Sequence, residues 1–172
     1  MDIGVALRGE LNDRMRGALD EAKDITEKTL QGVRDLSQLL HPSTLDDFGL
    51  PETLRAYLKR FAERTGINAQ LVTVPQGRLS SDIESCIYRI VQEALNNIAR
   101  HSGATACTVA LTTGERALQL TATDNGRGLA AAANGHGLGL IAMRERAQAL
   151  GGSFSINSVP GDGTRVLVTL PT

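Results

Sequence analysis

Residues 124–140 read Asp-Asn-Gly-Arg-Gly-Leu-Ala-Ala-Ala-Ala-Asn-Gly-His-Gly-Leu-Gly-Leu, and this glycine-rich stretch decides how the rest of the chain is interpreted. It follows an alternating apolar run, Leu118, Leu120 and Ala122, and it precedes a helical pattern that begins at Leu140. The stretch is therefore predicted to be a loop between a strand and a helix. Glycines let a backbone lie close to a ligand, and amides that lead into a helix bind anions. A bound polyphosphate is one interpretation, and a mobile surface loop is the other.

The composition restricts the class of protein. The chain has 172 residues, which is enough for one domain with an appendage. Its net charge is −1, so it shows no excess of basic residues that would indicate binding to nucleic acid. No apolar run approaches the roughly 20 residues that cross a bilayer, and no signal peptide opens the chain, so we predict a cytoplasmic protein. Cys86 and Cys107 occupy apolar positions of periodic segments. We expect them to be reduced core residues rather than a disulfide or a metal pair.

Residues 1–41 are predicted to form one long helix with a narrow apolar seam. The seam repeats every three or four residues, at Leu11, Met15, Ala18, Ala22, Ile25, Thr29, Val33, Leu36 and Leu40. Such a helix is not stable alone in water, so we expect it to pair with other helices, most simply with a second copy of the chain. Packing against the chain's own globular part is the alternative.

The rest of the chain is predicted to hold a short connector and one domain. Pro42 ends the long helix, and residues 42–50 are expected to form a structured connector that docks through Leu45, Phe48 and Leu50. Residues 51–172 then alternate between helical and strand patterns. We expect helices from 51, 81 and 140, and strands over 67–74, 107–111, 118–122, 154–156 and 166–170. This order predicts a two-layer α/β sandwich with one mixed sheet covered by helices.

The start of the middle helix carries a capping signal. Ser81-Asp82-Ile83-Glu84 matches a capping box, which predicts Ser81 as the N-cap residue and Glu84 as its reciprocal partner. A continuous apolar stripe follows from Ile83 to Ile98 at helical spacing, so this face of the helix is expected to be buried.

A polar line runs beside that stripe. Glu93, Asn97 and His101 stand four residues apart, which places them on one edge of a predicted helix. A carboxylate and a carboxamide one turn apart supply hard oxygen ligands that suit Mg²⁺ held jointly with phosphates. The alternative is a solvated helix face shared with Asn96 and Arg100.

Four motifs stand in order along residues 80–172. They are residues 87–102, Asp124–Gly128, Gly135–Leu140 and Gly161–Arg165. In this order they resemble the N-box, the two glycine boxes and the terminal Gly-x-Gly-Thr element of the histidine-kinase-type ATPases, the Bergerat fold shared with gyrase and Hsp90. Residues 36–50 and 143–147 further resemble the sensor-kinase branch that phosphorylates response regulators with helix-turn-helix output domains.

The resemblance implies ATP and Mg²⁺ as ligands, and it assigns roles on two sides of the nucleotide. Asp124 would accept a hydrogen bond from the exocyclic amine of adenine, which selects adenine over guanine, and Thr164 would help to hold a water near the base. Asn97 would ligate Mg²⁺, with Glu93 assisting the metal or polarising the nucleophile.

The resemblance also assigns backbone and phosphate contacts. Gly126 and Gly128 would let the backbone approach the base, while Arg100 or His101 would reach phosphate. Further phosphate contacts fall to the second glycine box, at Gly135, Gly137, Leu138 and Gly139. The short, alanine-rich segment 129–134 would form a small lid that orders when ATP binds.

The implied reaction is transfer of the γ-phosphoryl group of ATP to a histidine, for relay to a response regulator. A complete sensor kinase carries that histidine on the first of two dimerisation helices, and residues 1–41 have room only for the second. Asn12 lies in a stretch that weakly resembles the acceptor motif, and we interpret this resemblance as coincidence. His41 lies beside Pro42 at the helix end, so we do not expect it to be the acceptor. We therefore predict a catalytic part that lacks its acceptor histidine and has the acceptor helix as a partner.

Two other functions remain open at this point. The first is an ATPase or a serine-kinase switch of the same fold, because a Glu at the place of Glu93 acts as general base on water in the ATPase relatives. The second is a dimerisation or scaffold module without nucleotide affinity, for which replacing Asp124 would change nothing.

Overall fold

The computed structural model describes residues 43–73, 75, 78–114, 116–128 and 137–171, together with Leu19, Ala22, Lys23 and Thr26. The chain divides into two units, Met1–Ser43 and Thr44–Thr172. In the first unit the four described residues are helical, and the hydroxyl of Thr26 donates to the carbonyl of Ala22 at 2.7 Å. The rest of the predicted long helix, including every seam position except Ala22, lies outside the described residues.

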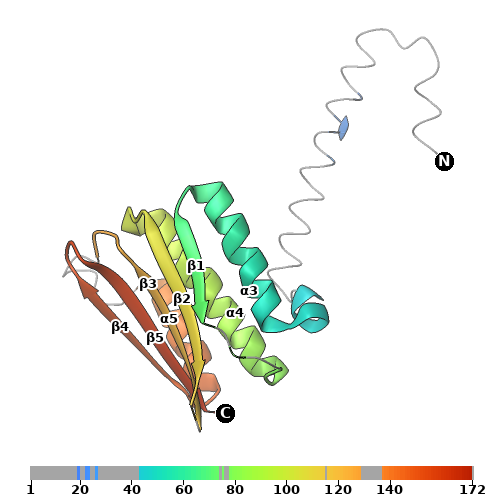
Figure 1. The fold of residues 1–172 in the computed structure, drawn as a ribbon, viewed down its shortest axis with the longest axis vertical. Helices are drawn as coiled ribbons and strands as arrows, with labels where there is room; N and C mark the ends of the chain where they lie inside the picture. Colours follow the sequence, from blue (N-terminus) through green and yellow to red (C-terminus); the bar gives the residue numbers. More distant parts are fainter. Residues whose placement is uncertain are drawn as a thin grey trace, which may run out of the picture. The chain divides into compact units, whose positions relative to one another are not determined.

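In the described part of the second unit, the strands form one five-stranded mixed sheet (Figure 1). The strands are β1 (Asn68–Thr73), β2 (Ala106–Thr113), β3 (Ala117–Asp124), β4 (Ser153–Val159) and β5 (Gly163–Pro171). Their order across the sheet is β1-β2-β3-β5-β4. β1 runs parallel to β2, and the other neighbours pair antiparallel. The predicted hairpin over β2 and β3 is confirmed, with Leu111 opposite Leu120.

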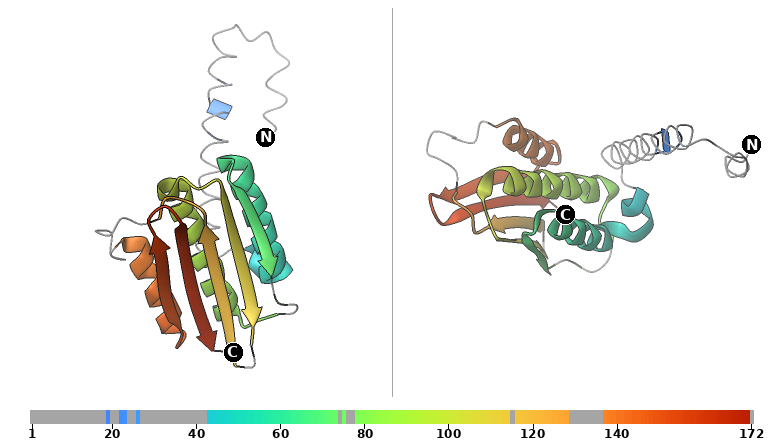
Figure 2. Two further views of the ribbon diagram at one scale, coloured as in Figure 1. Left: turned by 60° about the vertical axis from the view of Figure 1, so that its left-hand side comes forward. Right: turned by 90° about the horizontal axis from the view of Figure 1, so that it is seen from above.

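Helices cover one face of this sheet (Figure 2). They are α3 (Ser43–Thr65), α4 (Ser81–Asn97) and α5 (Leu138–Ala149), and a π-helical turn, η1 (Ile98–Ser102), continues α4. The strands alternate between buried apolar residues that face the helices and partly exposed or exposed residues on the other side, such as Thr108, Gln119 and Arg165. The predicted two-layer α/β sandwich is therefore confirmed.

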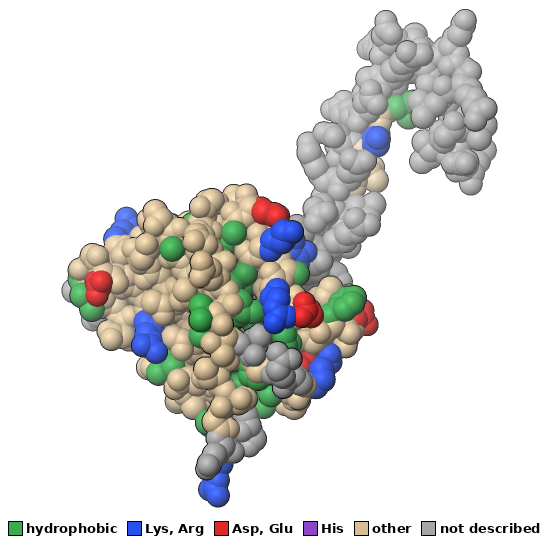
Figure 3. Space-filling view, viewed as in Figure 1, with side chains coloured by type: hydrophobic (Ala, Val, Ile, Leu, Met, Phe, Trp, Pro, Cys, Tyr) green, Lys and Arg blue, Asp and Glu red, His purple; other side chains and the backbone are tan. Residues whose placement is uncertain are grey.

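The charged groups of the surface are mixed in sign. On the face in Figure 3, lysine and arginine side chains alternate with aspartate and glutamate side chains over the described residues. None of the helices in the described part of the chain is both long and apolar enough to span a membrane.

The predicted connector is helical, and one of its three apolar residues does not dock. α3 begins at Ser43 and contains a break at Gly49, whose φ is 76° and ψ is 174°. Leu45 and Leu50 are buried as expected, but Phe48 is 66% exposed. The expectation for Phe48 is wrong, since its side chain, directly before the break at Gly49, faces solvent rather than the core.

The capping box is also wrong in its details. The N-cap residue of α4 is Ser80 rather than Ser81, and its side chain makes no capping hydrogen bond. The carboxylate of Glu84 is buried instead, where it accepts a hydrogen bond from the amide of Leu79 at 3.1 Å and lies 3.6 Å from Nε of Arg78. A buried carboxylate needs hydrogen bonds or a counter-charge, and Leu79 and Arg78 supply one of each here.

Both cysteines are free thiols in the core, as predicted. Cys86 donates weakly to the carbonyl of Arg146 at 3.6 Å, a contact that joins α4 to α5. Cys107 lies opposite Asp124 in the β2–β3 ladder and is 3% exposed. Burial, together with the nearby Asp124 carboxylate, raises the pKa of the Cys107 thiol from 9.0 to about 11.

Cys107 should therefore weaken the fold at alkaline pH. Between pH 9 and about 11 the unfolded thiol loses its proton while the folded thiol keeps it. Its contribution to the free energy of unfolding is complete below pH 9 and is lost as the pH rises, by up to about 3 kcal/mol. Urea denaturation from pH 8 to 11 should show this loss in the wild type relative to Cys107→Ala. Parallel pH dependences for the two proteins would contradict the assignment.

Candidate functional site

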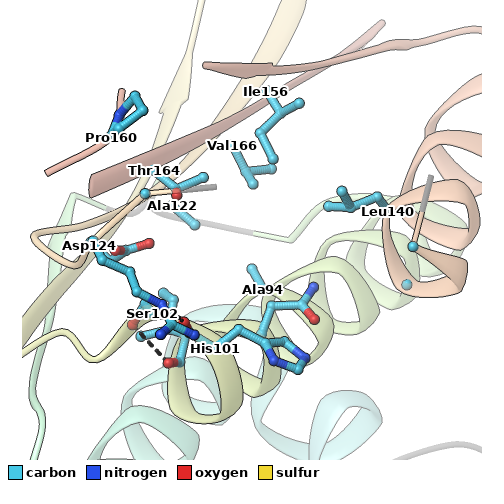
Figure 4. Close-up of a pocket in the computed structure, with 16 residues that line it drawn as sticks. Ala94, His101, Ser102, Ala122, Asp124, Leu140, Ile156, Pro160, Thr164 and Val166 are labelled. Atoms are coloured by element: carbon cyan, nitrogen blue, oxygen red, sulfur yellow. Dashed lines mark hydrogen bonds between the residues drawn. The ribbon is translucent and has the colours of Figure 1, made fainter. Parts of the chain in front are cut away.

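A cavity of about 670 Å³ opens between the helices and one end of the sheet (Figure 4). Seven of the residues singled out in the sequence line it: Asn97, His101, Asp124, Gly128, Gly137, Gly139 and Thr164. The sequence predicted no ligand contact for the other lining residues, which are Ala94, Ile98, Ser102, Ala122, Arg127, Leu140, Ile156, Pro160 and Val166. The motifs that are far apart in the chain thus meet around one space.

The strand register makes the sheet side of the cavity half apolar and half polar. Ala122 of β3 pairs with Val166 of β5, which pairs in turn with Ile156 of β4, and all three line the cavity. Two residues further along β3, Asp124 pairs with Thr164, whose hydroxyl lies 3.0 Å from the hydroxyl of Ser158. A flat apolar wall therefore ends in a row of polar groups.

Asp124 is the buried charge of this row. It is 6% exposed, and its Oδ1 accepts a hydrogen bond from the amide of Gly126 at 2.8 Å. Burial raises the pKa of the Asp124 carboxyl, while hydrogen bonds from the backbone of Gly126 and Thr164 oppose that shift. These amides hold the carboxylate in a fixed orientation, so it presents a preorganised acceptor to a ligand in the cavity.

The glycines around Asp124 bring separate segments into close contact. A Cβ at Gly126 would overlap Ser102, and a Cβ at Gly128 would overlap the carbonyl of Val159. A Cβ at Gly163 would overlap the carbonyl of Asp124, and Gly163 has a φ of 89°. In the described structure these glycines let the loop 124–128 pack against η1 and against the turn between β4 and β5.

The predicted polar line on α4 is interrupted by η1. Asn97 is the last residue of α4, and the wider π-helical turn begins directly after it, so His101 does not continue the spacing of an α-helix. Asn97 and His101 still line the cavity, but Arg100 is exposed outside it. Glu93 is not among the residues that line the cavity, and its carboxylate lies close to Gly139 at the start of α5.

The start of α5 supplies backbone donors. Gly137 is the N-cap residue, and Leu138 and Gly139 form the first turn. Amides in the first turn of a helix have no carbonyl partner within the helix, and together they favour an anion. Leu138 is 87% exposed. Gly135 and the predicted lid over 129–134 lie outside the described residues.

Comparison with known proteins gives the family. The model for the histidine kinase-, DNA gyrase B-, and HSP90-like ATPase family matches residues 82–172, and the chain belongs to this family. It is 34% identical to the signal transduction histidine-protein kinase/phosphatase DegS of Brevibacillus brevis, over 99% of this chain and 47% of that protein. It is 33% identical to the sensor histidine kinase LiaS of Bacillus subtilis, over 89% of this chain and 46% of that protein. The chain thus spans about half the length of these curated relatives.

Solved structures agree on the fold. The histidine kinase domain from the Erythrobacter litoralis EL346 blue-light activated histidine kinase is 25% identical, with a TM-score of 0.56 over 67% of this chain and 59% of that one. The mycobacterial sensor histidine kinase MprB is 22% identical, with a TM-score of 0.54 over 70% of this chain and 92% of that one, and this likeness concerns the fold alone.

A pair of glycines in the β4–β5 turn tests the close packing at Asp124. Gly161 has a φ of 84°, and a Cβ added to it would meet no other atom. Gly163 has a similar φ, but a Cβ added to it would overlap the carbonyl of Asp124. Gly161→Ala should lower the free energy of unfolding by about 1 kcal/mol, the cost of a left-handed non-glycine residue. Gly163→Ala should lower it by about 3 kcal/mol, because a backbone overlap is added. Urea denaturation measures both, and equal losses would contradict the packing.

Proposed function

We propose that this chain is the ATP-binding catalytic part of a two-component sensor histidine kinase. One observation carries the proposal: a buried, amide-oriented carboxylate, Asp124, lies at the polar end of an apolar cavity wall, and Asn97 and His101 line the helix side of that cavity (Figure 4). Family membership and the histidine kinase names of the relatives support the same conclusion.

The cavity suits adenine at its sheet end. A planar base would lie against Ala122, Val166 and Ile156 and would direct its exocyclic amine toward the Asp124 carboxylate. The carboxylate favours this donor, whereas guanine presents a carbonyl oxygen at the same position and two acceptors repel each other. Thr164, beside Asp124 in the ladder, would hold a water near the base.

The helix side suits phosphates and a magnesium ion. Asn97 offers a carboxamide oxygen, the type of hard ligand that fits Mg²⁺ shared with phosphate oxygens. His101 and the first-turn amides of Leu138 and Gly139 would contact phosphate, and Gly135 would add a further amide. Arg100 would have to move from its exposed position to do so. Glu93, one turn before Asn97, would assist the metal or polarise the nucleophile.

The chemistry of such a site is positioning and charge neutralisation. Mg²⁺ would supply the charge that offsets the developing negative charge on the transferred phosphoryl group. We propose that the acceptor is a histidine on a separate dimerisation helix, from which the group passes to a response regulator. The long helix over residues 1–41 would pair with a second copy. Because ATP is the substrate, the proposed location is the cytoplasm.

Titration calorimetry tests the nucleotide site directly. The wild type should bind ATP with micromolar to sub-millimolar affinity in the presence of Mg²⁺, and it should not bind GTP. Asp124→Asn should weaken ATP binding about 10- to 150-fold, because a hydrogen bond to a charged acceptor is lost. Asp162→Asn, an exposed residue of the β4–β5 turn, is the matched control and should bind as the wild type does. A folded wild type without ATP affinity would refute the proposal.

The destination of the phosphoryl group distinguishes the kinase from an ATPase or a serine-kinase switch. An ATPase would use Glu93 as a base on water, whereas the proposed kinase passes the phosphoryl group to a histidine. With γ-labelled ATP and a separate dimerisation helix pair, label should appear on that helix pair as an acid-labile, alkali-stable phosphohistidine. Release of inorganic phosphate that Glu93→Gln abolishes would support the ATPase instead, and acid-stable label would support the serine kinase.

A further inference from the structure

Arg127 connects three segments around the cavity. Its Nε donates a hydrogen bond to the carbonyl of His101 at 2.8 Å, and its backbone amide donates to the carbonyl of Ser102 at 2.9 Å. Its own carbonyl accepts a hydrogen bond from the amide of Gly161 at 2.8 Å. Arg127 also lines the cavity, so one residue of the first glycine box joins η1 to the β4–β5 turn.

The two carbonyls that Arg127 contacts lie at the end of η1. Carbonyls in the last turn of a helix have no amide partner within the helix, so they need donors from elsewhere. Ser102 satisfies part of this need, since its hydroxyl donates to the carbonyl of Ile98 at 2.7 Å and accepts from the amide of Ala104 at 2.9 Å. Arg127 supplies the donors for His101 and Ser102 themselves.

The position of η1 determines where the phosphate side of the site lies. Asn97 directly precedes η1, and His101 belongs to it, and both line the cavity. π-Helical turns are rare, and they are frequently found at functional sites. The guanidinium of Arg127 also places a positive charge at a helix C-terminus, where it is favourable. Arg127 itself is exposed, so its side chain adds little to the global stability.

We propose that Arg127 is a positioning residue for nucleotide binding: its Nε–H bond to the His101 carbonyl fixes η1, and with it His101 and Asn97, against the cavity. This inference rests on the proposed function, since it assigns Arg127 a task in binding ATP with Mg²⁺. It differs from a direct role in which the positive charge of Arg127 attracts phosphate.

Two substitutions separate these roles. Arg127→Gln keeps an N–H donor at nearly the position of Nε and removes the charge, whereas Arg127→Met keeps the length and removes both. Arg127→Met should raise the Kd for ATP with Mg²⁺ about five- to tenfold, the effect of one charge-assisted hydrogen bond, and Arg127→Gln should stay within about twofold of the wild type. The matched control is Arg165→Met, an exposed arginine on the open face of the sheet, which should not change the Kd.

Hydrogen exchange measured without nucleotide tests directly whether Arg127 holds η1 in place. The amides of Ala104 and residue 127 bond within the η1 contact, and they should exchange about five- to tenfold faster in Arg127→Met but not in Arg127→Gln, at unchanged thermal midpoints. Equal weakening of binding by both variants with unchanged exchange would overturn the inference in favour of a charge effect. Unchanged binding in both variants would also overturn it. A wild type that does not bind ATP would refute the proposed function instead, and the exchange data would still test the positioning.

Discussion

The structure depends on a carboxylate placed at the end of an apolar strand face. Along β3, the residues that face the helices are Leu118, Leu120, Ala122 and Asp124, so the strand's period of two puts the charge in line with the core. A buried carboxylate is costly unless hydrogen bonds satisfy it, and the amide of Gly126 does so within the same loop. The loop conformation and the orientation of Asp124 therefore require each other.

The close contacts of the glycines follow from the same constraint. Once Gly126 turns back to bond Asp124, the loop lies against Ser102, where a side chain on residue 126 would not fit. Gly128 and Gly163 allow the same loop to touch the β4–β5 turn. Glycines that resemble ligand-contacting positions in the sequence thus serve first to bring three chain segments together. The cavity forms where these segments meet, next to the apolar wall of the sheet.

The sequence predicts some of these features well and others not at all, for physical reasons. Alternation along β2, β3 and β5 is strict, so the strands, the β2–β3 hairpin and the place of Asp124 at the end of β3 follow from the pattern. The π-helical turn does not, because Ile98–Ser102 has ordinary helix-compatible residues and its geometry depends on donors from Arg127, which is distant in the sequence. The pattern also does not predict the partners of Glu84, because a capping box pairs it with the N-cap residue, whereas its carboxylate pairs with Arg78 and with the amide of Leu79 just before the helix. A helical pattern predicts hydrogen bonds within the helix, whereas the end of η1 and the buried carboxylate of Glu84 are completed by residues outside it.

The two sides of the cavity are supported in different ways, and this difference bears on how such a site works. The sheet side is held by continuous ladders through β2, β3, β5 and β4, so Asp124 and Thr164 have little freedom to move. The helix side is held by a π-helical turn, one arginine and the first turn of α5, where the carboxylate of Glu93 lies against Gly139. The start of a helix favours negative charge, so an anion bound there would lie close to this carboxylate and compete with it. In the proposed nucleotide site, selection of the base would therefore belong to the rigid side, and adjustment to the phosphates would belong to the side whose contacts can be exchanged.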